Sequence, residues 1–353
     1  MRPLPRMRGR GPGGGGLSAF PVPNPRMPLK LGIVDQSPVP TGGTGADAVS
    51  NTLELARAAE RLGYTRYWLA EHHSTNSFAG SAPEVLIPMV AAATRTLRVG
   101  AGGVLLPHYS PFKVAEQFRV LEALFPGRID LGIGRAPGGD ARTAAALGYG
   151  RPPDIAGFPA QVAELIGWLE NSYDKRHPWG RVRAMPRGDT VPPVWLLGSG
   201  GQSGLYAAEL GCGYCFAQFI SGEDGAASVR AYRERFRPSR HFAEPHASLA
   251  VGVVCADTED EARRLASSLE LWRRRITLGR DRGIPSPQEA LAELGEDWRP
   301  PAGRAVVGDP AQVSAEIRRL AAHYEVDEVM AVTVTHDFAA RLRSHELLAE
   351  ALL

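Results

Sequence analysis

Along most of the chain, short apolar runs alternate with longer segments in which apolar residues recur at the spacing of a helix. A short run that is apolar throughout is typical of a strand covered on both faces, as in a parallel sheet. The apolar runs predict strands over residues 29–35, 67–70, 97–106, 128–134, 193–199, 214–219, 248–256 and 327–334. The segments between them predict helices over residues 47–62, 83–95, 110–124, 158–170, 202–210, 223–236, 258–278 and 310–323, with a last helix that runs to the C-terminus.

Two of these helices carry clear end signals. Gly63 stands where a C′ glycine is expected, and Ser110 followed by Pro111 is typical of an N-cap and a first helical position. Strands that alternate with helices favour a parallel sheet, and eight such units favour a closed barrel over an open sheet. We therefore predict an α/β protein, a single-domain (β/α)8 TIM barrel over residues 29–353.

Two segments depart from this alternation. Residues 1–28 are rich in Gly, Pro and Arg, a composition that cannot bury enough apolar surface to fold, so they predict a disordered tail. Residues 150–190 place one helical piece among Pro, Arg and Gly and predict an insertion in the barrel. A two-domain chain would need a linker there, and the apolar helix argues against one.

Charge and hydropathy narrow the class of partner. The formal net charge is +2, but residues 1–28 hold five arginines and no acid, which leaves about −3 for the rest. Such a folded part does not favour nucleic-acid binding. Because the sequence has neither an apolar run of about 18 residues nor the apolar core of a signal peptide, we expect a cytoplasmic protein without a membrane span.

Cys212 and Cys215 have the C-x-x-C spacing of a redox pair. A thioredoxin-type pair precedes a helix whose N-terminus lowers the thiol pKa, whereas this pair follows a predicted helix and begins a strand. The position favours buried packing in a reducing compartment over redox chemistry.

Polar side chains collect where the predicted strands end, and in a TIM barrel these ends form the mouth that holds the chemistry. The residues are Asp35, Gln36, Ser37, Glu71, His72, His73, His108, Arg135, Ser199, Ser203, Gln218 and His336. The sequence YTRYWLAEHH over 64–73 is the densest case, since an apolar run ends there in a carboxylate and two imidazoles.

Three further features point to a ligand. GSGGQSG over 198–204 lies between a strand and a helix, so its backbone N–H groups can converge on a phosphate; a plain tight turn would use the same glycines. Gly100, Gly102 and Gly103 lie inside a strand and indicate the close approach of a flat ring or of a packed neighbour. Arg135 precedes Pro-Gly-Gly at the mouth, where it suits a phosphate, with a surface salt bridge as the alternative.

Together these features resemble the bacterial luciferase-like flavin monooxygenases. The resemblance covers nearly all of residues 29–353 and is carried by LGIVDQSPVP, YWLAEHH, APEVLIP, the long block VGAGGVLLPHYSPFKVAEQFRVLEALFPGRIDLGIGRAPGG over 99–139, VWLLGSGGQS, VVGDPAQV, and the segment 327–352. It implies a (β/α)8 barrel that binds FMN.

The resemblance also implies roles for individual residues. It implies a cis peptide at Gly102–Gly103 behind the flavin ring, phosphate binding by Arg135 and the loop residues Ser199, Gly200, Gly201 and Ser203, and catalysis by His72, with its neighbour His73. Gln36, His108 and Gln218 are the residues that we assign to the substrate. Gln218 stands where relatives often carry histidine, and residues 150–190 match poorly, so the substrate is the least defined part.

The function that this resemblance implies is a monooxygenase that inserts one atom of O2 into a small organic substrate, such as a natural product in a tailoring step. Reduced FMN would be a co-substrate from a separate NAD(P)H:flavin reductase, and we expect a homodimer. One alternative is a deazaflavin-dependent oxidoreductase on the same fold. Another is a metal-dependent TIM-barrel hydrolase with ligands among Asp35, Glu71, His72, His73 and His108, although the adjacent histidines would leave a strand on opposite faces. A third alternative is a flavin-binding protein without turnover.

Overall fold

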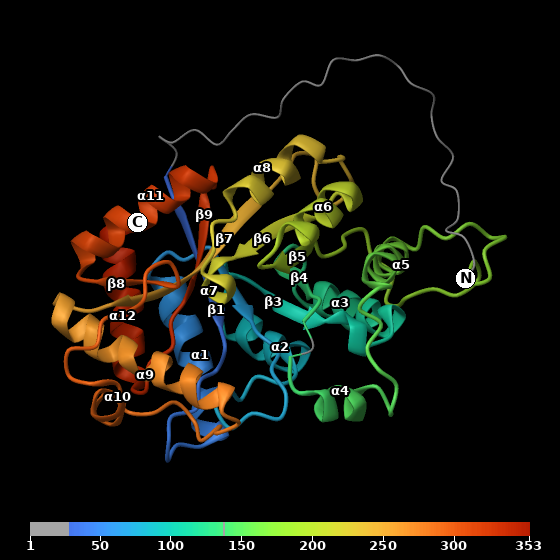
Figure 1. Cartoon of the computed structure of the whole chain (residues 1–353). Helices are drawn as coiled ribbons and strands as arrows, with labels where there is room; N and C mark the ends of the chain where they lie inside the picture. The colour runs from blue at the N-terminus through green and yellow to red at the C-terminus, as the bar shows by residue number, and fades with distance from the viewer. Residues whose placement is uncertain (1–27, 137) are drawn as a thin grey trace.

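The computed structural model of the chain describes residues 28–136 and 138–353 (Figure 1). The predicted disordered tail lies outside these residues, apart from Pro28. The strands are β1 (Lys30–Asp35), β2 (Arg66–Leu69), β3 (Arg98–Leu105), β4 (Ile129–Gly134), β5 (Val194–Gly198), β6 (Gly213–Ala217), β7 (Ala247–Cys255), β8 (Ala305–Gly308) and β9 (Glu328–Val332). All the strand pairs are parallel.

Eight of these strands close into a barrel. The pairing runs from β1 through β6 in chain order, continues from β6 to β7 and from β7 to β9, and returns from β9 to β1. This ring confirms the predicted single-domain (β/α)8 architecture. The remaining strand, β8, lies outside the ring and pairs, among the described strands, with the C-terminal half of β7 alone, through Gly252 to Cys255.

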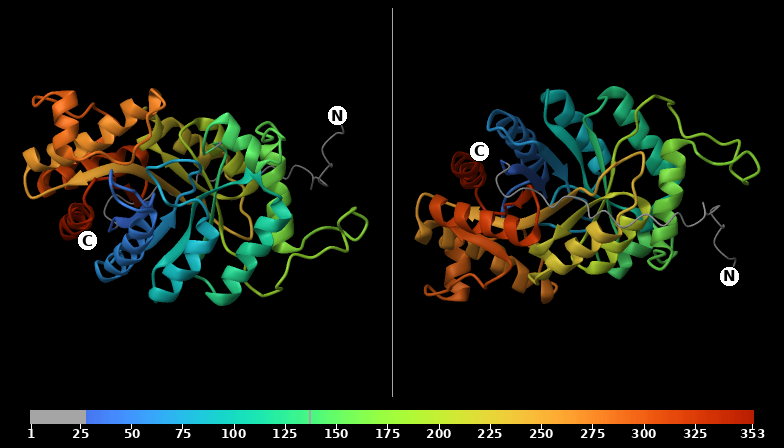
Figure 2. Two further views of the ribbon diagram at one scale, coloured as in Figure 1. Left: turned by 90° about the horizontal axis from the view of Figure 1, so that it is seen from below. Right: turned by 90° about the horizontal axis from the view of Figure 1, so that it is seen from above.

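Helices surround the barrel (Figure 2). They are α1 (Gly45–Arg61), α2 (Pro83–Ala93), η1 (Leu106–His108), α3 (Pro111–Leu124), α4 (Ala141–Leu147), α5 (Phe158–Glu170), α6 (Gly201–Leu210), α7 (Gln218–Ser221), α8 (Ala226–Arg235), α9 (Glu259–Thr277), α10 (Pro287–Leu294), α11 (Pro310–Tyr324) and α12 (Phe338–Leu352). The predicted end signals are confirmed, because Ser110 is the N-cap of α3 and Gly63 follows α1 with a φ of +89°.

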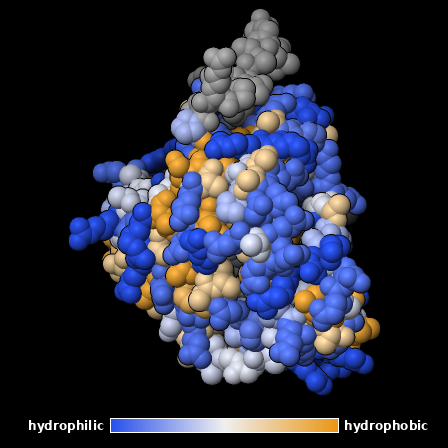
Figure 3. All heavy atoms as spheres, turned by 90° about the vertical axis from the view of Figure 1, so that its left-hand side faces the viewer, coloured by the Kyte–Doolittle hydropathy of each residue, from blue (hydrophilic) through white to orange (hydrophobic). Residues whose placement is uncertain are grey.

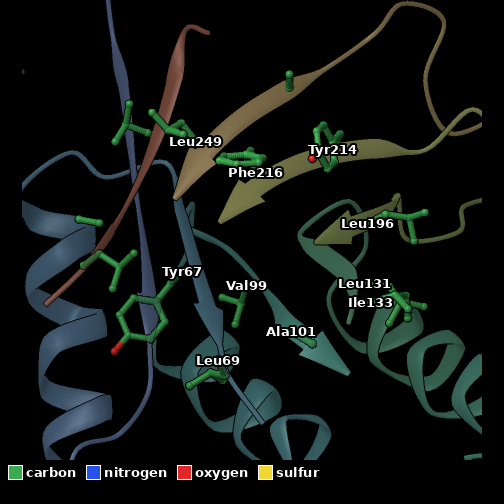
Figure 4. Packing of buried hydrophobic residues seen from close by; sticks show 14 of the residues in the cluster. Tyr67, Leu69, Val99, Ala101, Leu131, Ile133, Leu196, Tyr214, Phe216 and Leu249 are labelled. Atoms are coloured by element: carbon green, nitrogen blue, oxygen red, sulfur yellow. The ribbon is translucent and has the colours of Figure 1, made fainter. Parts of the chain in front are cut away.

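Side chains alternate between the two faces of each strand, so the core has two parts, one outside and one inside the barrel. Side chains such as those of Tyr67, Leu69, Val99 and Ala101 leave the barrel toward the helices and form the larger cluster (Figure 4). The residues between them, such as Trp68, point inward and fill the barrel with Trp195, Cys215, Ala250 and Met330. The side of the molecule drawn in Figure 3 is hydrophilic over much of its surface, with apolar residues gathered in patches.

The segment predicted as an insertion, residues 150–190, adds α5 and long irregular loops, one of which protrudes from the barrel (Figure 2). Helix α5 packs on α3 through aromatic side chains, because the ring centroids of Trp168 in α5 and Phe112 in α3 lie 4.8 Å apart. In the described part of the chain, no helix is long and apolar enough to cross a membrane.

Candidate active site

A cavity of about 1150 Å³ opens at the C-terminal mouth of the barrel. All eight barrel strands contribute residues to its wall, either from the strands themselves or from the loops that follow them. Helix α9 closes one side with Leu269, Trp272, Arg273 and Ile276. This is the end of the barrel where the sequence predicts the chemistry.

Part of the cavity wall is the cis peptide between Gly102 and Gly103. The register of β3 on β4 shifts between Ala101 and Val104, so the strand bulges at these glycines. A Cβ at Gly102 would lie 2.8 Å from the Cβ of Trp68, and one at Gly103 would lie 2.8 Å from the Gly132 carbonyl oxygen. Close packing alone therefore accounts for both glycines, and the resemblance is correct about the cis bond.

The loop after β5 leads directly into the N-terminus of α6. Gly200 is the N-cap, and no side chain caps the first turn, so its backbone N–H groups are available to an anion. A Cβ on Gly200 would meet open space. Ser199, Gly200 and Ser203 line the cavity. The arrangement has the form of the phosphate-binding loop that the sequence predicts.

Arg135 follows β4 and reaches this loop, because its Nη1 donates to Oε1 of Gln202 in α6 at 2.6 Å. Within the described ranges Arg135 forms no ion pair with a carboxylate. The salt-bridge alternative is therefore wrong. A permanent cation stands beside the positive end of a helix, and both favour the same kind of ligand.

Glu71 and His73 are joined in a hydrogen-bonded set with Tyr109. The Tyr109 hydroxyl donates to Oε1 of Glu71 at 2.6 Å, and Nε2 of His73 lies 2.7 Å from the same oxygen. The backbone N–H of Leu105 donates to Oε2 at 3.0 Å. Glu71 is buried, so these donors stabilise its carboxylate and fix the imidazole of His73 in place.

His72 has different surroundings. Its ring lies 4.8 Å from that of Phe78, between centroids, and its Nδ1 is a buried atom with no hydrogen-bond partner among the described residues. Burial, with a smaller contribution from the neighbouring His73, lowers the pKa of His72 to about 4. The imidazole is therefore neutral near pH 7.

Comparison with known proteins identifies the chain. The family model described as luciferase-like monooxygenase matches residues 29–325. The chain belongs to this family. It is 44% identical over 333 residues to the uncharacterized protein YceB of Bacillus subtilis (strain 168), covering 92% of this chain and all of the relative. It is 36% identical over 332 residues to the N-acetyl-S-alkylcysteine monooxygenase of the same organism, covering 92% of this chain and 98% of the relative.

Solved structures agree with this assignment. Apo-MsnO8 matches with a TM-score of 0.85 at 40% identity and covers 92% of this chain and 99% of its own. Two more distant structures share the fold alone. The oxygenating constituent of 3,6-diketocamphane monooxygenase from Pseudomonas putida, in complex with FMN, matches at a TM-score of 0.65 and 19% identity, covering 92% of this chain and 98% of its own. A coenzyme F420-dependent secondary alcohol dehydrogenase matches at a TM-score of 0.67 and 14% identity, covering 93% of this chain and 100% of its own.

Membership in the luciferase-like monooxygenases makes the metal-dependent hydrolase alternative wrong. Its proposed ligand Asp35 is instead part of a buried structural network, in which it accepts hydrogen bonds from Arg341, Tyr67 and Thr52. Burial acts to raise the pKa of Asp35, but Arg341 and these hydrogen bonds together lower it. No group of three or more His, Cys, Asp or Glu among residues 28–136 and 138–353 is arranged to hold a metal ion.

The cavity brings together most of the predicted site residues of this luciferase-like monooxygenase. Those that line it are Gln36, His72, His73, Gly102, Gly103, Arg135, Ser199, Gly200 and Ser203. Three predicted site residues, Gly201, His108 and Gln218, do not line the cavity. Gly201 faces Ser228, whose Oγ would lie 3.1 Å from an added Cβ. His108 ends η1, outside the cavity wall. Strand β6 ends at Ala217, two residues before its predicted end, so Gln218 is the first residue of α7. Its side chain is buried.

The sequence does not predict the wall that α9 supplies to the cavity. The segment 258–278 was predicted as a helix, but nothing in its pattern showed that it crosses the mouth. Cys215 also lines the cavity, as a buried free thiol whose pKa burial raises to about 12. Cys212 and Cys215 are both free and buried, which supports packing over redox pairing.

Proposed function

We propose that this luciferase-like monooxygenase uses reduced FMN from a separate reductase to insert one atom of O2 into a small organic substrate. The observation that carries the proposal is the position of Arg135 against the uncapped N-terminus of α6 at the edge of the cavity, since this cation forms no ion pair among the described residues. A phosphate monoester is the ligand that both groups favour. FMN has such a phosphate.

The cavity fits this cofactor. Ligand pockets commonly occupy about 300–1,000 Å³, so a cavity of about 1150 Å³ has room for a flavin and a small substrate together. The open space at Gly200 leaves the phosphate loop accessible. Gly102 and Gly103 present backbone without side chains to the cavity, which suits contact with a planar ring.

The cavity residues have two proposed roles, binding of FMN and transfer of protons. Arg135, Ser199, Gly200 and Ser203 would hold the phosphate, and Gly102–Gly103 would lie against the ring. Reduced FMN, when bound, supplies two electrons, so that one oxygen atom enters the substrate and the other leaves as water. His72 is neutral and its Nδ1 has no hydrogen-bond partner among the described residues, so in the tautomer with the proton on Nε2 it can accept a proton at Nδ1 and then return it.

His73 has a different role in this proposal. Its Nε2 is held by Glu71 and Tyr109, so it orients groups at the cavity wall and is not the primary proton carrier. Gln36 remains the predicted contact for substrate within the cavity. Apolar side chains such as those of Phe78 and Trp272 exclude water from the same space.

The test of the proposal is FMN binding to Arg135→Ala, with Arg142→Ala on exposed α4 as the matched control. Loss of a charge-assisted hydrogen bond to phosphate costs about 1.5–3 kcal/mol, or roughly ten- to a hundredfold in affinity. Riboflavin lacks the phosphate, so its affinity should be nearly the same in both variants. If Arg135→Ala binds FMN as tightly as the wild type, the phosphate assignment is wrong.

A deazaflavin is the second candidate cofactor, because a structure of this fold is a coenzyme F420-dependent dehydrogenase. Anaerobic titration with reduced FMN, reduced FAD and reduced F420 separates the two. We expect FMN to bind most tightly, and weaker when oxidised than when reduced. Tight binding of F420 without FMN binding would make the enzyme a deazaflavin-dependent oxidoreductase.

The partners follow from the same reaction. A neighbour of this fold is described as the oxygenating constituent of its enzyme, which supports a separate NAD(P)H:flavin reductase here. The N-acetyl-S-alkylcysteine monooxygenase is 36% identical, so thioether-bearing N-acetyl amino acids are substrates to test beside natural products. We also propose a homodimer, formed through the exposed apolar side chains of α2 and α3.

A further inference from the structure

One face of α9 forms an apolar wall of the cavity that contains a single cation. Leu269, Trp272, Arg273 and Ile276 line the cavity at positions i, i+3, i+4 and i+7, which lie on the same side of a helix. The ring of Trp272 meets that of Phe78 at 5.1 Å between centroids, and Phe78 in turn contacts His72. The apolar wall and Arg273 are therefore continuous with the proposed proton-transfer residue.

Arg273 lacks the carboxylate partners that its neighbours on α9 have. Arg274 pairs with Glu270 at 3.3 Å, and Arg275 pairs with Glu289 and Glu293. Among the residues that the structure describes, Arg273 forms no ion pair, and its one hydrogen bond is a long donation from Nη2 to the Phe219 carbonyl at 3.4 Å.

The surroundings of Arg273 disfavour a charged guanidinium that has no anionic partner. Burial lowers the pKa of Arg273, and the nearby cation Arg304 lowers it further, with Glu270 opposing. A guanidinium that is mostly removed from water and faces a second cation favours an anionic ligand, since a buried charge is costly unless it is paired.

The acidic side chains of the cavity wall are already occupied. Glu71 accepts from Tyr109 and from the Leu105 N–H. Asp281 accepts from the side chains of Thr75 and Ser77 and from the Asn76 N–H. Asp140 caps α4 by accepting from the Thr143 N–H. None of the three is bound to Arg273, so among the described residues no carboxylate of the cavity wall pairs with this cation.

Arg273 is also separate from the phosphate loop. Arg135 follows β4 and contacts α6, whereas Arg273 belongs to α9 and contacts Phe219 of α7. The β4–α4 side of the mouth and α9 lie on different sides of the barrel (Figure 1). Two separate cations in one cavity suit two separate anionic groups.

We propose that Arg273 binds the carboxylate of the organic substrate, whose remaining body is apolar and lies along Leu269, Trp272 and Ile276. This proposal rests on the proposed function, because it assigns the second anion to substrate after the first has been assigned to FMN. An alcohol, an amine or an unsubstituted hydrocarbon of the same size would leave Arg273 unpaired.

The test compares matched acids and amides on the FMN-loaded enzyme and on the enzyme without FMN. The probes are N-acetyl-S-methylcysteine with its carboxamide, and octanoate with octanamide, measured by isothermal titration calorimetry. We expect the wild type to prefer the acid of at least one pair by about tenfold or more. Equal affinity for acid and amide in both pairs would overturn the proposal without the use of any variant.

Variants then assign the preference to Arg273. Arg273→Gln should lose it, Arg273→Lys should keep part of it, and Arg274→Gln, one position along α9, should match the wild type. FMN affinity should stay unchanged in all three. An acid preference that survives Arg273→Gln would overturn the proposal, as would a loss of FMN affinity alone, because Arg273 would then serve the cofactor.

The two proposals fail in different ways. If no flavin binds while the acid preference still depends on Arg273, the FMN assignment fails and the carboxylate site stands. If FMN binds with the expected dependence on Arg135 while acid and amide bind alike, the carboxylate site fails and the FMN assignment stands.

Discussion

At the scale of single residues, His72 and His73 show how neighbours in sequence acquire different chemistry. Adjacent residues that leave a strand point to opposite faces, but β2 ends at Leu69, and both histidines lie in the irregular segment after it, which lines the cavity. Their partners distinguish them instead. His73 is held by Glu71, and His72 packs on Phe78 with Nδ1 unsatisfied. No sequence pattern contains this difference, because Tyr109 and Phe78 come from other segments.

The neutral state of His72 leads to a kinetic prediction. His72→Ala should slow oxygen transfer by about 10²–10⁴-fold, the usual contribution of a positioned proton carrier, while FMN affinity stays close to wild type. Because the pKa of His72 is about 4, the wild-type rate should show no loss from this group between pH 8 and about pH 5. Single-turnover kinetics with reduced FMN across this range measure both effects. A fall in rate centred near pH 6.5 would show that the imidazole is not buried as described.

Buried neutral histidines also predict acid sensitivity. Burial lowers the pKa of His72 to about 4 and that of fully buried His345 to about 3, with Arg341 adding to the effect at His345. The unfolded chain takes up these protons near pH 6.5, so it gains stability relative to the fold as pH falls below that value. Between pH 7 and pH 5, the free energy of unfolding should fall by about 2 kcal/mol for each histidine.

Denaturant unfolding at pH 7 and pH 5 checks this prediction. The double variant His72→Gln/His345→Gln should lose much less stability between the two pH values than the wild type. His323→Gln is the control, because His323 is exposed on α11 and pairs with Asp224. An unchanged pH dependence in the double variant would contradict the prediction.

At the scale of elements, the barrel end opposite the cavity is held by a buried charge network. Arg66 at the start of β2 pairs with Asp130 of β4 and, at 3.0 Å, with Glu328 at the start of β9. Its guanidinium also lies over the rings of Trp68 and Trp195, at 5.4 and 4.7 Å from their centroids. One side chain therefore joins three strands and the aromatic residues inside the barrel.

Removing this arginine should destabilise the fold. Arg66→Met leaves two buried carboxylates without their shared partner, and such a loss typically costs about 3–5 kcal/mol. Arg57→Met, on the exposed face of α1, is the matched control and should change stability by less than about 0.5 kcal/mol. Denaturant unfolding at pH 7 measures both variants. A small effect at Arg66 would mean that the network does not hold the strands together.

The elements that could be predicted are those with strong apolar patterns. All eight barrel strands are where the apolar runs predict them, and α5 spans the predicted residues 158–170. The missed elements are short. Strand β8 has four residues after Pro300, Pro301 and Gly303, and α10 has eight residues between the predicted helices 258–278 and 310–323, where no element is predicted. Its apolar run is only Ala305–Val307 between Arg304 and Gly308, and its pairing with β7 is a tertiary event that the local pattern does not contain.

At the scale of the whole molecule, α2 and α3 present apolar side chains that the barrel does not cover. Val85 and Met89 of α2 and Val120 and Leu124 of α3 are exposed, with Val85 and Leu124 each 61% accessible. The two helices are adjacent, since the amide of Gln117 in α3 donates to Glu84 in α2. Helix α2 is apolar on nearly all sides, which is typical of a buried helix. These features are the basis for our proposal that the homodimer forms through this pair of helices.

The dimer can be tested with one charge on each helix. Val85→Glu and Leu124→Glu should each weaken self-association by about a hundredfold or more, because a central apolar contact contributes about 2 kcal/mol or more and a buried unpaired carboxylate costs further. Leu278→Glu, at a 67% exposed position beyond the end of α9, is the control and should leave association unchanged. Analytical ultracentrifugation over a range of concentrations measures all three. If the wild type stays monomeric at micromolar concentration, or if both α2 and α3 variants dimerise as the wild type does, the surface has another role and the active site is complete within one chain.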